Sequence, residues 1–125
     1  MVGVIPACDN TGSPPTGPVS GGNVSALDIG TMLVIANVVV ARDANGVYAM
    51  SAICTHEGCF VSDGQKTIVA GLYCGCHGSA FDGEGQVTRG PAGRPLQHYA
   101  VAIDGAGEIT VDGSQPVADS TRTPA

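Results

Sequence analysis

Four of the five cysteines and two of the three histidines lie in one segment, from Cys54 to Gly93. The same segment contains glycines at positions 58, 64, 71, 75, 78, 83, 85, 90 and 93. Glycine at this density is typical of turns and loops, because it adopts backbone conformations that other residues avoid. We therefore predict that the middle of the chain consists of loops that are built around a site.

The segments on either side of this region are rich in valine and isoleucine, which favour strands. The expected strands are Val24 to Asp28, Thr31 to Ala41, Gly46 to Ile53, Pro95 to Ile103 and Glu108 to Asp112. Asn45-Gly46 predicts a hairpin turn, and the segment Asp104 to Gly107 predicts a second turn. Because no segment repeats its apolar residues with a helical period, we expect an all-β protein. The predicted fold is an antiparallel β-sandwich or barrel base with an inserted loop-rich subdomain.

The chain has 125 residues, a length that suits one domain. Residues 1–23 are expected to form a flexible N-terminal segment, residues 24–112 the domain, and residues 113–125 a frayed C-terminal tail. The inserted subdomain is expected at about residues 53–93. The longest apolar stretch, Thr31 to Ala41, is too short for a membrane helix, so the chain as given is expected to be soluble.

Eleven acidic residues and five basic residues give a net charge of −6. The basic residues are scattered from Arg42 to Arg122 and do not form a cluster, which argues against a nucleic acid as partner. An acidic carrier could dock on the basic face of a redox partner, although acidity also simply keeps small proteins soluble.

An odd number of cysteines leaves one thiol outside any pairing, and Cys8 is the expected one because it stands apart from the others. The sequence Ile5-Pro6-Ala7-Cys8 loosely resembles the end of a lipoprotein signal, which would imply lipidation of Cys8. A thiol in a disordered tail is an equal alternative.

Two short motifs carry the strongest signal in the sequence. The first is Cys54-Thr55-His56-Glu57-Gly58-Cys59, and the second is Cys74-Gly75-Cys76-His77-Gly78-Ser79. Both resemble the motifs of the Rieske iron-sulfur family, C-x-H-x-G-C and C-x-C-H-G-S, at every fixed position. The resemblance continues through Phe81-Asp82-Gly83 and Gly90-Pro91-Ala92 to Leu96. It covers the chain from about Ile53 onward and implies a Rieske fold.

The resemblance implies that Cys54 and Cys74 bind one iron of a 2Fe-2S cluster and that His56 and His77 bind the other. Thiolate suits an iron that stays ferric, whereas neutral imidazole makes the second iron easier to reduce. The chain would therefore carry one electron at a time and would need no catalytic residue of its own.

The resemblance also implies a disulfide between Cys59 and Cys76 that clamps the two motif loops together. A disulfide indicates an oxidising compartment, so we expect an exported protein in the periplasm or on the outer face of a membrane. A tetrahedral zinc site with the same two cysteines and two histidines is the alternative. It would leave Cys59 and Cys76 without a role.

Further positions match residues that lie around the cluster in the family. Ser79 matches a serine that donates a hydrogen bond to the cluster, and Phe81 occupies the place of a second donor, a tyrosine, in high-potential members. Pro91 belongs to a segment that resembles the loop covering the cluster. Glu57 replaces an apolar residue of the respiratory proteins. His98, in an expected strand, is interpreted as structural.

These features leave three classes of electron carrier. The first is a carrier, or the small subunit of an exported oxidoreductase, resembling that of arsenite oxidase, with a cytochrome or a large oxidoreductase subunit as partner. The second is the Rieske subunit of a quinol-oxidising cytochrome bc complex that lacks its membrane anchor, and Phe81 and Glu57 argue against it. The third, a dioxygenase ferredoxin, is disfavoured because those proteins lack the two disulfide cysteines.

Overall fold

The structure, a computed structural model, describes residues 12–55, 58–61, 64–76 and 78–125. In this part of the chain the strands are β1 (Pro18–Asn23), β2 (Thr31–Ile35), β3 (Val38–Asp43), β4 (Gly46–Ser51), β5 (Gln65–Thr67), β6 (Leu72–Tyr73), β7 (Ala80–Phe81), β8 (Val87–Arg89), β9 (His98–Ile103) and β10 (Glu108–Val117). Seven of them form an antiparallel sheet in the order β1-β10-β9-β4-β3-β2-β5, and β6-β7-β8 form a small second sheet. The predicted all-β class is therefore confirmed.

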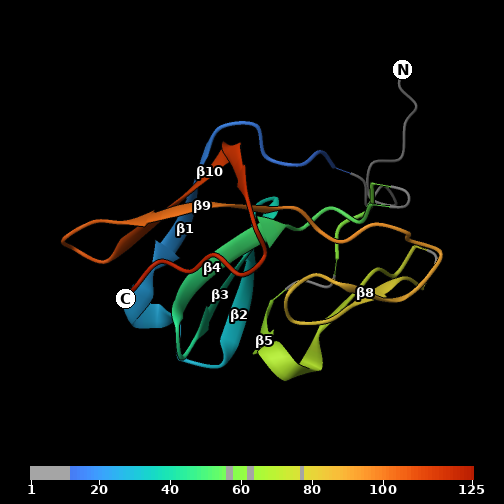
Figure 1. Ribbon diagram of the computed structural model, residues 1–125, viewed down its shortest axis with the longest axis horizontal. Coiled ribbons are helices and arrows are strands. Elements are labelled where there is room, and N and C mark those ends of the chain that lie inside the picture. The colour runs from blue at the N-terminus through green and yellow to red at the C-terminus, as the bar shows by residue number, and fades with distance from the viewer. Residues whose placement is uncertain (1–11, 56–57, 62–63, 77) are drawn as a thin grey trace, which may run out of the picture.

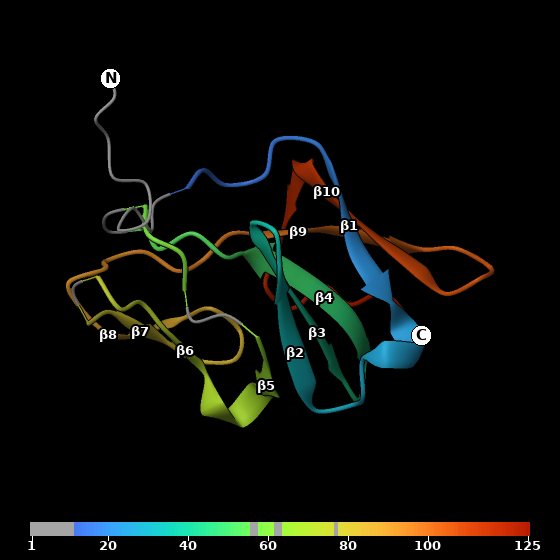
Figure 2. The ribbon, with the colours of Figure 1, turned by 180° about the vertical axis from the view of Figure 1, so that it is seen from behind.

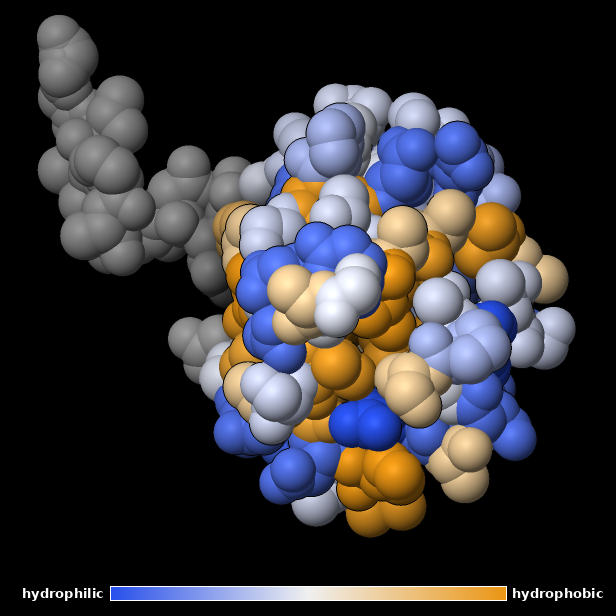
Figure 3. Space-filling model, turned by 90° about the vertical axis from the view of Figure 1, so that its left-hand side faces the viewer, coloured by the Kyte–Doolittle hydropathy of each residue, from blue (hydrophilic) through white to orange (hydrophobic). Residues whose placement is uncertain are grey.

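We call the seven-stranded sheet the base, and the described residues between β4 and β9, apart from β5, the insert. Figures 1 and 2 show the insert beside the base, with β5 next to β2 where the two meet. The C-terminus lies on the base (Figure 1). Figure 3 views the molecule from the end away from the insert, where apolar residues reach the surface among polar ones.

The central strands β3 and β4 are apolar on both faces because each face is covered by a separate core. Val38 and Val40 pack into a core with β9 and β10, whereas Val39 and Ala41 pack into a core shared with the insert. Since side chains alternate across a strand, consecutive residues of β3 enter different cores. This explains the uninterrupted valine run, in which no polar residue faces solvent.

The apolar run from Thr31 to Ala41 forms two strands, not the single strand expected. The chain turns back at Ala36 and Asn37, so that Ile35 pairs with Val38. Ala36 takes a positive φ of 51°, which lets the two-residue turn match the twist of its strands. The predicted hairpin near Asn45 is present, and Asp43 pairs with Gly46 across it.

The N-terminal part differs from expectation. Pro18–Asn23 is a strand that pairs with β10, within the segment expected to be flexible. The expected strand from Val24 to Asp28 begins with a short 3-10 helix, Val24–Ala26, capped by the Asn23 side chain, which accepts a hydrogen bond from Ser25 N–H at 2.9 Å. An asparagine at this place favours a helix start over a continued strand.

The C-terminal residues also differ from the frayed tail expected for residues 113–125. Strand β10 continues to Val117, and Thr123 forms a β-bridge with Val47. The Arg122 side chain is only 9% exposed and binds Asp43 and Glu84. Polar composition suggested a tail, but side-chain and backbone hydrogen bonds attach this segment to the base.

Candidate metal centre

The first loop, residues 54–59, follows β4 and turns back on itself. Cys54 N–H donates to Cys59 O at 2.6 Å, and Gly58 N–H donates to Cys54 O at 3.0 Å. Gly58 has a φ of +74°, a conformation that favours glycine. The glycine of the first motif is therefore required by the turn that presents Cys54.

The second loop, residues 74–79, repeats this backbone arrangement. Cys74 N–H donates to Ser79 O at 2.7 Å, and Gly78 N–H donates to Cys74 O at 3.1 Å. Gly78 has a φ of +80°, close to that of Gly58. The two motifs thus form the same turn, and Cys54 and Cys74 occupy equivalent positions in it.

The two loops lie side by side and are joined covalently. Val61, just after the first loop, forms a β-bridge with Cys74. The disulfide implied by the family resemblance is present between Cys59 and Cys76, whose Cα atoms are 6.4 Å apart. Cys54 and Cys74 are not part of a disulfide and are 2% and 1% exposed. Each loop therefore has one buried cysteine outside the disulfide, whose thiol is a candidate soft ligand.

The sulfur atoms of Cys59, Cys74 and Cys76 lie within 4.8 Å of one another. They do not form a three-thiolate metal site, because two of them are bonded to each other. His56 and His77 lie outside the described residues, as does Glu57. The assignment of His56 and His77 as ligands, and of Glu57 as the neighbour of a ligand, remains a prediction.

Ser79 connects the second loop to the segment that resembles the covering loop. Its hydroxyl is fully buried and accepts a hydrogen bond from Ala92 N–H at 2.9 Å. A hydroxyl that accepts here still has its own hydrogen to donate elsewhere. Pro91 is exposed and follows a cis Gly90–Pro91 bond, whereas Ala92 is buried.

Phe81, on β7, is 2% exposed and packs in the core that the base shares with the insert. Its ring carries no hydroxyl and therefore cannot donate a hydrogen bond. The structure gives Phe81 a packing role, and its effect on a cluster remains a prediction.

One contact at the site has no signal in the sequence. The hydroxyl of Thr55 donates to Arg94 O at 2.7 Å, which ties the first loop to the segment after Pro91. Thr55 stands at a variable position of its motif. Sequence reasoning could not have singled it out, because many exposed threonines make no such bond.

The chain before β1 also reaches the first loop. Gly12 N–H donates to Gly58 O at 2.8 Å, and a Cβ atom at position 12 would lie 2.7 Å from the Phe60 ring. Residue 12 must therefore be small. This part of the N-terminal segment lies against the first loop and is not a free lead-in.

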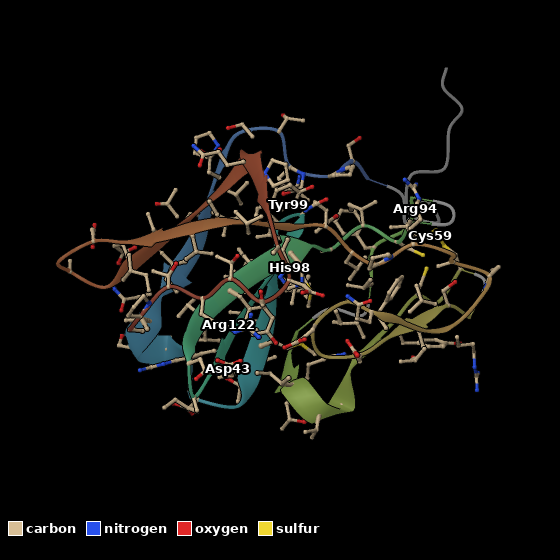
Figure 4. The ribbon with its side chains drawn as sticks, in the orientation of Figure 1. Asp43, Cys59, Arg94, His98, Tyr99 and Arg122 are labelled. Atoms are coloured by element: carbon tan, nitrogen blue, oxygen red, sulfur yellow. A yellow bond between two sulfur atoms is a disulfide. The ribbon has the colours of Figure 1, made fainter. Side chains whose placement is uncertain are left out.

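A stack of three side chains, Tyr48, His98 and Arg122, lies where the base meets the insert, and Figure 4 labels His98 and Arg122. The rings of His98 and Tyr48 are parallel, with centroids 5.6 Å apart, and Arg122 lies 3.9 Å from the centroid of the Tyr48 ring. The Tyr48 hydroxyl donates to Gly83 O at 2.6 Å, and His98 Nε2 lies 2.7 Å from Glu84 O. His98 thus has the structural role expected of it.

Burial and nearby charges shift the pKa values of Tyr48 and Asp43. Burial raises the pKa of Tyr48 to about 12, although the positive charge of Arg122 opposes the shift. Burial alone would raise the pKa of Asp43, but hydrogen bonds from Arg122 and from the following turn lower it below its usual value. Arg122 and Asp43 are 2.8 Å apart, which explains the direction.

Within the described ranges, no helix has the length and apolar character needed to cross a membrane.

Comparison with known proteins covers both sequence and structure. The family described as Rieske 2Fe-2S domain matches residues 18–100. The cytochrome b6-f complex iron-sulfur subunit of Synechococcus sp. (strain CC9605) is 41% identical over 69 residues, 54% of this chain and 36% of that protein. That of Chlorobaculum tepidum is 39% identical over 75 residues, 59% of this chain and 39% of that protein. The match thus spans well under half of these relatives.

Among solved structures, the cyanobacterial plasma membrane Rieske protein PetC3 of Synechocystis PCC 6803 is similar with a TM-score of 0.59 and 32% identity. The similarity covers 74% of this chain and 97% of that one. A quaternary ammonium Rieske monooxygenase, CntA, shares the fold at 13% identity and a TM-score of 0.61, over 86% of this chain and 33% of that chain. The two motif loops form the same kind of turn and are joined by a disulfide, in agreement with the family match. The chain belongs to the Rieske 2Fe-2S domain family.

Proposed function

We propose that this chain is a one-electron carrier whose 2Fe-2S cluster is held by Cys54, His56, Cys74 and His77. When bound, such a cluster takes up and releases single electrons. The observation that carries the proposal is the pair of equivalent turns, each of which presents one buried cysteine. The disulfide removes Cys59 and Cys76 from the set of possible ligands. Among the described residues this leaves the thiols of Cys54 and Cys74, the two that mixed Cys/His ligation needs.

The chain's own residues would hold and shield the group. The disulfide fixes the separation of the two loops, and the Ser79 and Thr55 hydrogen bonds attach both loops to the segment 90–94. Cys54 and Cys74 lie in the apolar core that the insert shares with the base, and this core would exclude water from their sulfur atoms. Ligands held in fixed positions reduce the structural change that occurs when the cluster gains or loses an electron.

The compartment and the partners follow from the same features. The Cys59–Cys76 disulfide supports an oxidising location outside the cytoplasm, in the periplasm or on an outer membrane face. We propose redox proteins as partners, either a cytochrome or the large subunit of an oxidoreductase. In this role the chain transfers electrons and performs no substrate chemistry itself.

Metal analysis and spectroscopy of the purified protein test the proposal. We expect two irons and two labile sulfides per chain and, after reduction, the rhombic EPR signal of mixed Cys/His ligation. Cys54→Ser and Cys74→Ser should each abolish the visible absorption and leave the far-ultraviolet circular dichroism of the base unchanged. Stoichiometric zinc, or the signal of an all-cysteine cluster, would refute the ligand set.

A second candidate is the iron-sulfur subunit of a quinol-oxidising complex, because the relatives named above are subunits of cytochrome b6-f complexes. The Gly12 contact with the first loop argues against a free hinge at residues 12–17, and Phe81 lacks the donor of high-potential members. Reduction of the oxidised protein by quinol within a membrane fraction, blocked by a quinol-site inhibitor, would favour this candidate. Reduction only by a soluble donor protein would favour the first.

A further inference from the structure

Two arginines on the insert are available for an external partner. Arg89 and Arg94 are exposed, and within the described ranges neither side chain forms a hydrogen bond or ion pair. By contrast, Arg122 is bound by Asp43 and Glu84, and Arg42 donates to Leu27 O at 3.2 Å. Arg42 and Arg122 of the base are thus used within the fold, whereas Arg89 and Arg94 of the insert have no partner among the residues that the structure describes.

The two arginines flank the candidate metal centre, one beside each loop. Arg89 pairs with Ala80, the residue directly after the second loop. The backbone of Arg94 is held to the first loop by the Thr55 hydroxyl, and Arg94 lines the same groove as Gly58 of that loop. Their backbones are therefore held beside the two loops, and both exposed side chains belong to the insert.

The described residues of the two loops and of the segment 89–96 carry two cations, whereas the whole chain is acidic. No described residue of the two loops or of the segment 89–96 is acidic. The described carboxylates lie at other positions, among them Asp82 and Glu84 of the insert and Asp28, Asp104 and Asp112 of the base, and Glu57 of the first loop lies outside the described residues. The protein is therefore an acidic molecule in which two arginines beside the candidate centre have no partner among the described residues.

A groove of about 480 Å³ lies beside Arg94 and leads to the first loop. Its lining includes Pro14, Cys54, Thr55, Gly58, Arg94 and Tyr99. A side chain that entered it would contact Arg94 and lie next to Cys54, a proposed iron ligand. Because carboxylates pair with guanidinium in two-point hydrogen bonds, an acidic side chain suits this groove.

We propose that the redox partner of this chain docks on the insert with an acidic surface, and that one of its carboxylate side chains enters the groove to pair with Arg94, while Arg89 contacts the rim. This inference rests on the proposed electron-carrier function. It reverses the expectation from net charge, by which an acidic carrier would seek a basic partner. The local charge at the contact surface determines docking, because charges more than about 10 Å away are screened at physiological salt.

Electron exchange with small charged oxidants tests the proposal on the intact, cluster-loaded protein. Ferricyanide, a trivalent anion, should oxidise the reduced protein more slowly as salt rises from about 10 mM to about 300 mM, because an attraction is being screened. Tris(phenanthroline)cobalt(III), a trivalent cation, should show no such fall. If net charge governs the approach, ferricyanide would instead react faster at high salt, and the proposal would be wrong.

Three single substitutions that each lower the net charge by one unit show which part of the surface controls the ferricyanide rate. Arg94→Gln and Arg89→Gln should each lower the ferricyanide rate about threefold at low salt. Gln115→Glu, on exposed β10 of the base, makes the same change in net charge and should leave the rate unchanged. Equal losses in all three variants would overturn the proposal, whereas a wild-type protein with no iron or no electron exchange would refute the carrier function itself.

A competitor and a further variant complete the experiment. An oligoglutamate peptide should slow the ferricyanide reaction more than sodium chloride at equal ionic strength, and this extra inhibition should disappear in Arg94→Gln. No extra inhibition would argue against an acidic protein surface as the partner. If Arg94 affects the rate only after Glu57→Gln, Arg94 pairs with Glu57 within the chain, and the proposal fails.

Discussion

In the base, strands β3 and β4 bury their side chains on both faces of a seven-stranded sheet, whereas the insert contains two- and three-residue strands and two hydrogen-bonded loops. The base is therefore stabilised mainly by apolar burial. The insert is stabilised by a disulfide, by turns at positive-φ glycines and by the core that it shares with one face of the base. The difference indicates that the insert can lose order while the base stays folded.

Removal of the disulfide should have the largest effect and should affect the insert alone. Cys59→Ser/Cys76→Ser opens a loop of 18 residues, worth about 3 kcal/mol in chain entropy. In hydrogen exchange on the iron-free protein, the amides of Cys54 and Cys74 should lose about a hundredfold protection. The amides of β3 should keep theirs. An equal loss in β3 would mean that base and insert open as one unit.

Two neighbouring valines of β3 separate the two cores. Val39→Ala and Val40→Ala remove the same atoms from fully buried positions, and each should lower the free energy of unfolding by about 2 kcal/mol. Val39 lies in the core shared with Cys54 and Cys74, and Val40 lies in the other core. Only Val39→Ala should speed the loss of visible absorption in mild denaturant. Equal bleaching in both variants would contradict the separation of the cores.

The Tyr48 hydroxyl connects base and insert through Gly83, so Tyr48→Phe should destabilise the protein by about 1 kcal/mol at neutral pH. The raised pKa predicts a further difference in alkali. A neutral hydroxyl is favoured in the folded state, so its contribution is fully present below pH 10.0 and is lost as pH rises towards about 12. Urea titrations between these pH values should show stability falling in wild type more steeply than in the variant. Parallel curves would show that Tyr48 does not titrate with unfolding.

The ion pair of Asp43 with Arg122 should have the smallest effect, below about 1 kcal/mol, because it is partly exposed. The lowered pKa of Asp43 means that its contribution is present above its usual value of 3.8 and is lost as pH falls through the folded-state pKa. Asp43→Asn should therefore be less stable than wild type at neutral pH and similar to it in strong acid. Acid titration monitored by circular dichroism measures this, and a difference that persists in strong acid would have another cause.

Much of this architecture could be predicted from the sequence, but not all of it. Valine-rich runs and turn signals gave the β class, and the two motifs located both loops and the disulfide. The turn at Ala36 was missed because alanine rarely adopts positive φ. Strand β1 and the segment around Arg122 were missed because their order comes from partners far away in sequence. The Arg94 groove likewise depends on tertiary contacts and leaves no local pattern.

The Gly12 contact with Gly58 has a practical consequence for electrochemistry. A tag or gold linkage at Cys8 would lie within about 14 Å of Gly12, and so would hold the insert against the electrode. The C-terminal residues leave the molecule at the other end of β4, where Thr123 bridges Val47. Immobilisation through Ala125 would instead expose Arg89, Arg94 and both loops to proteins in solution. Attachment at Cys8 would then report electron transfer directly from the insert to the electrode, whereas attachment at Ala125 would report electron transfer to a dissolved partner protein.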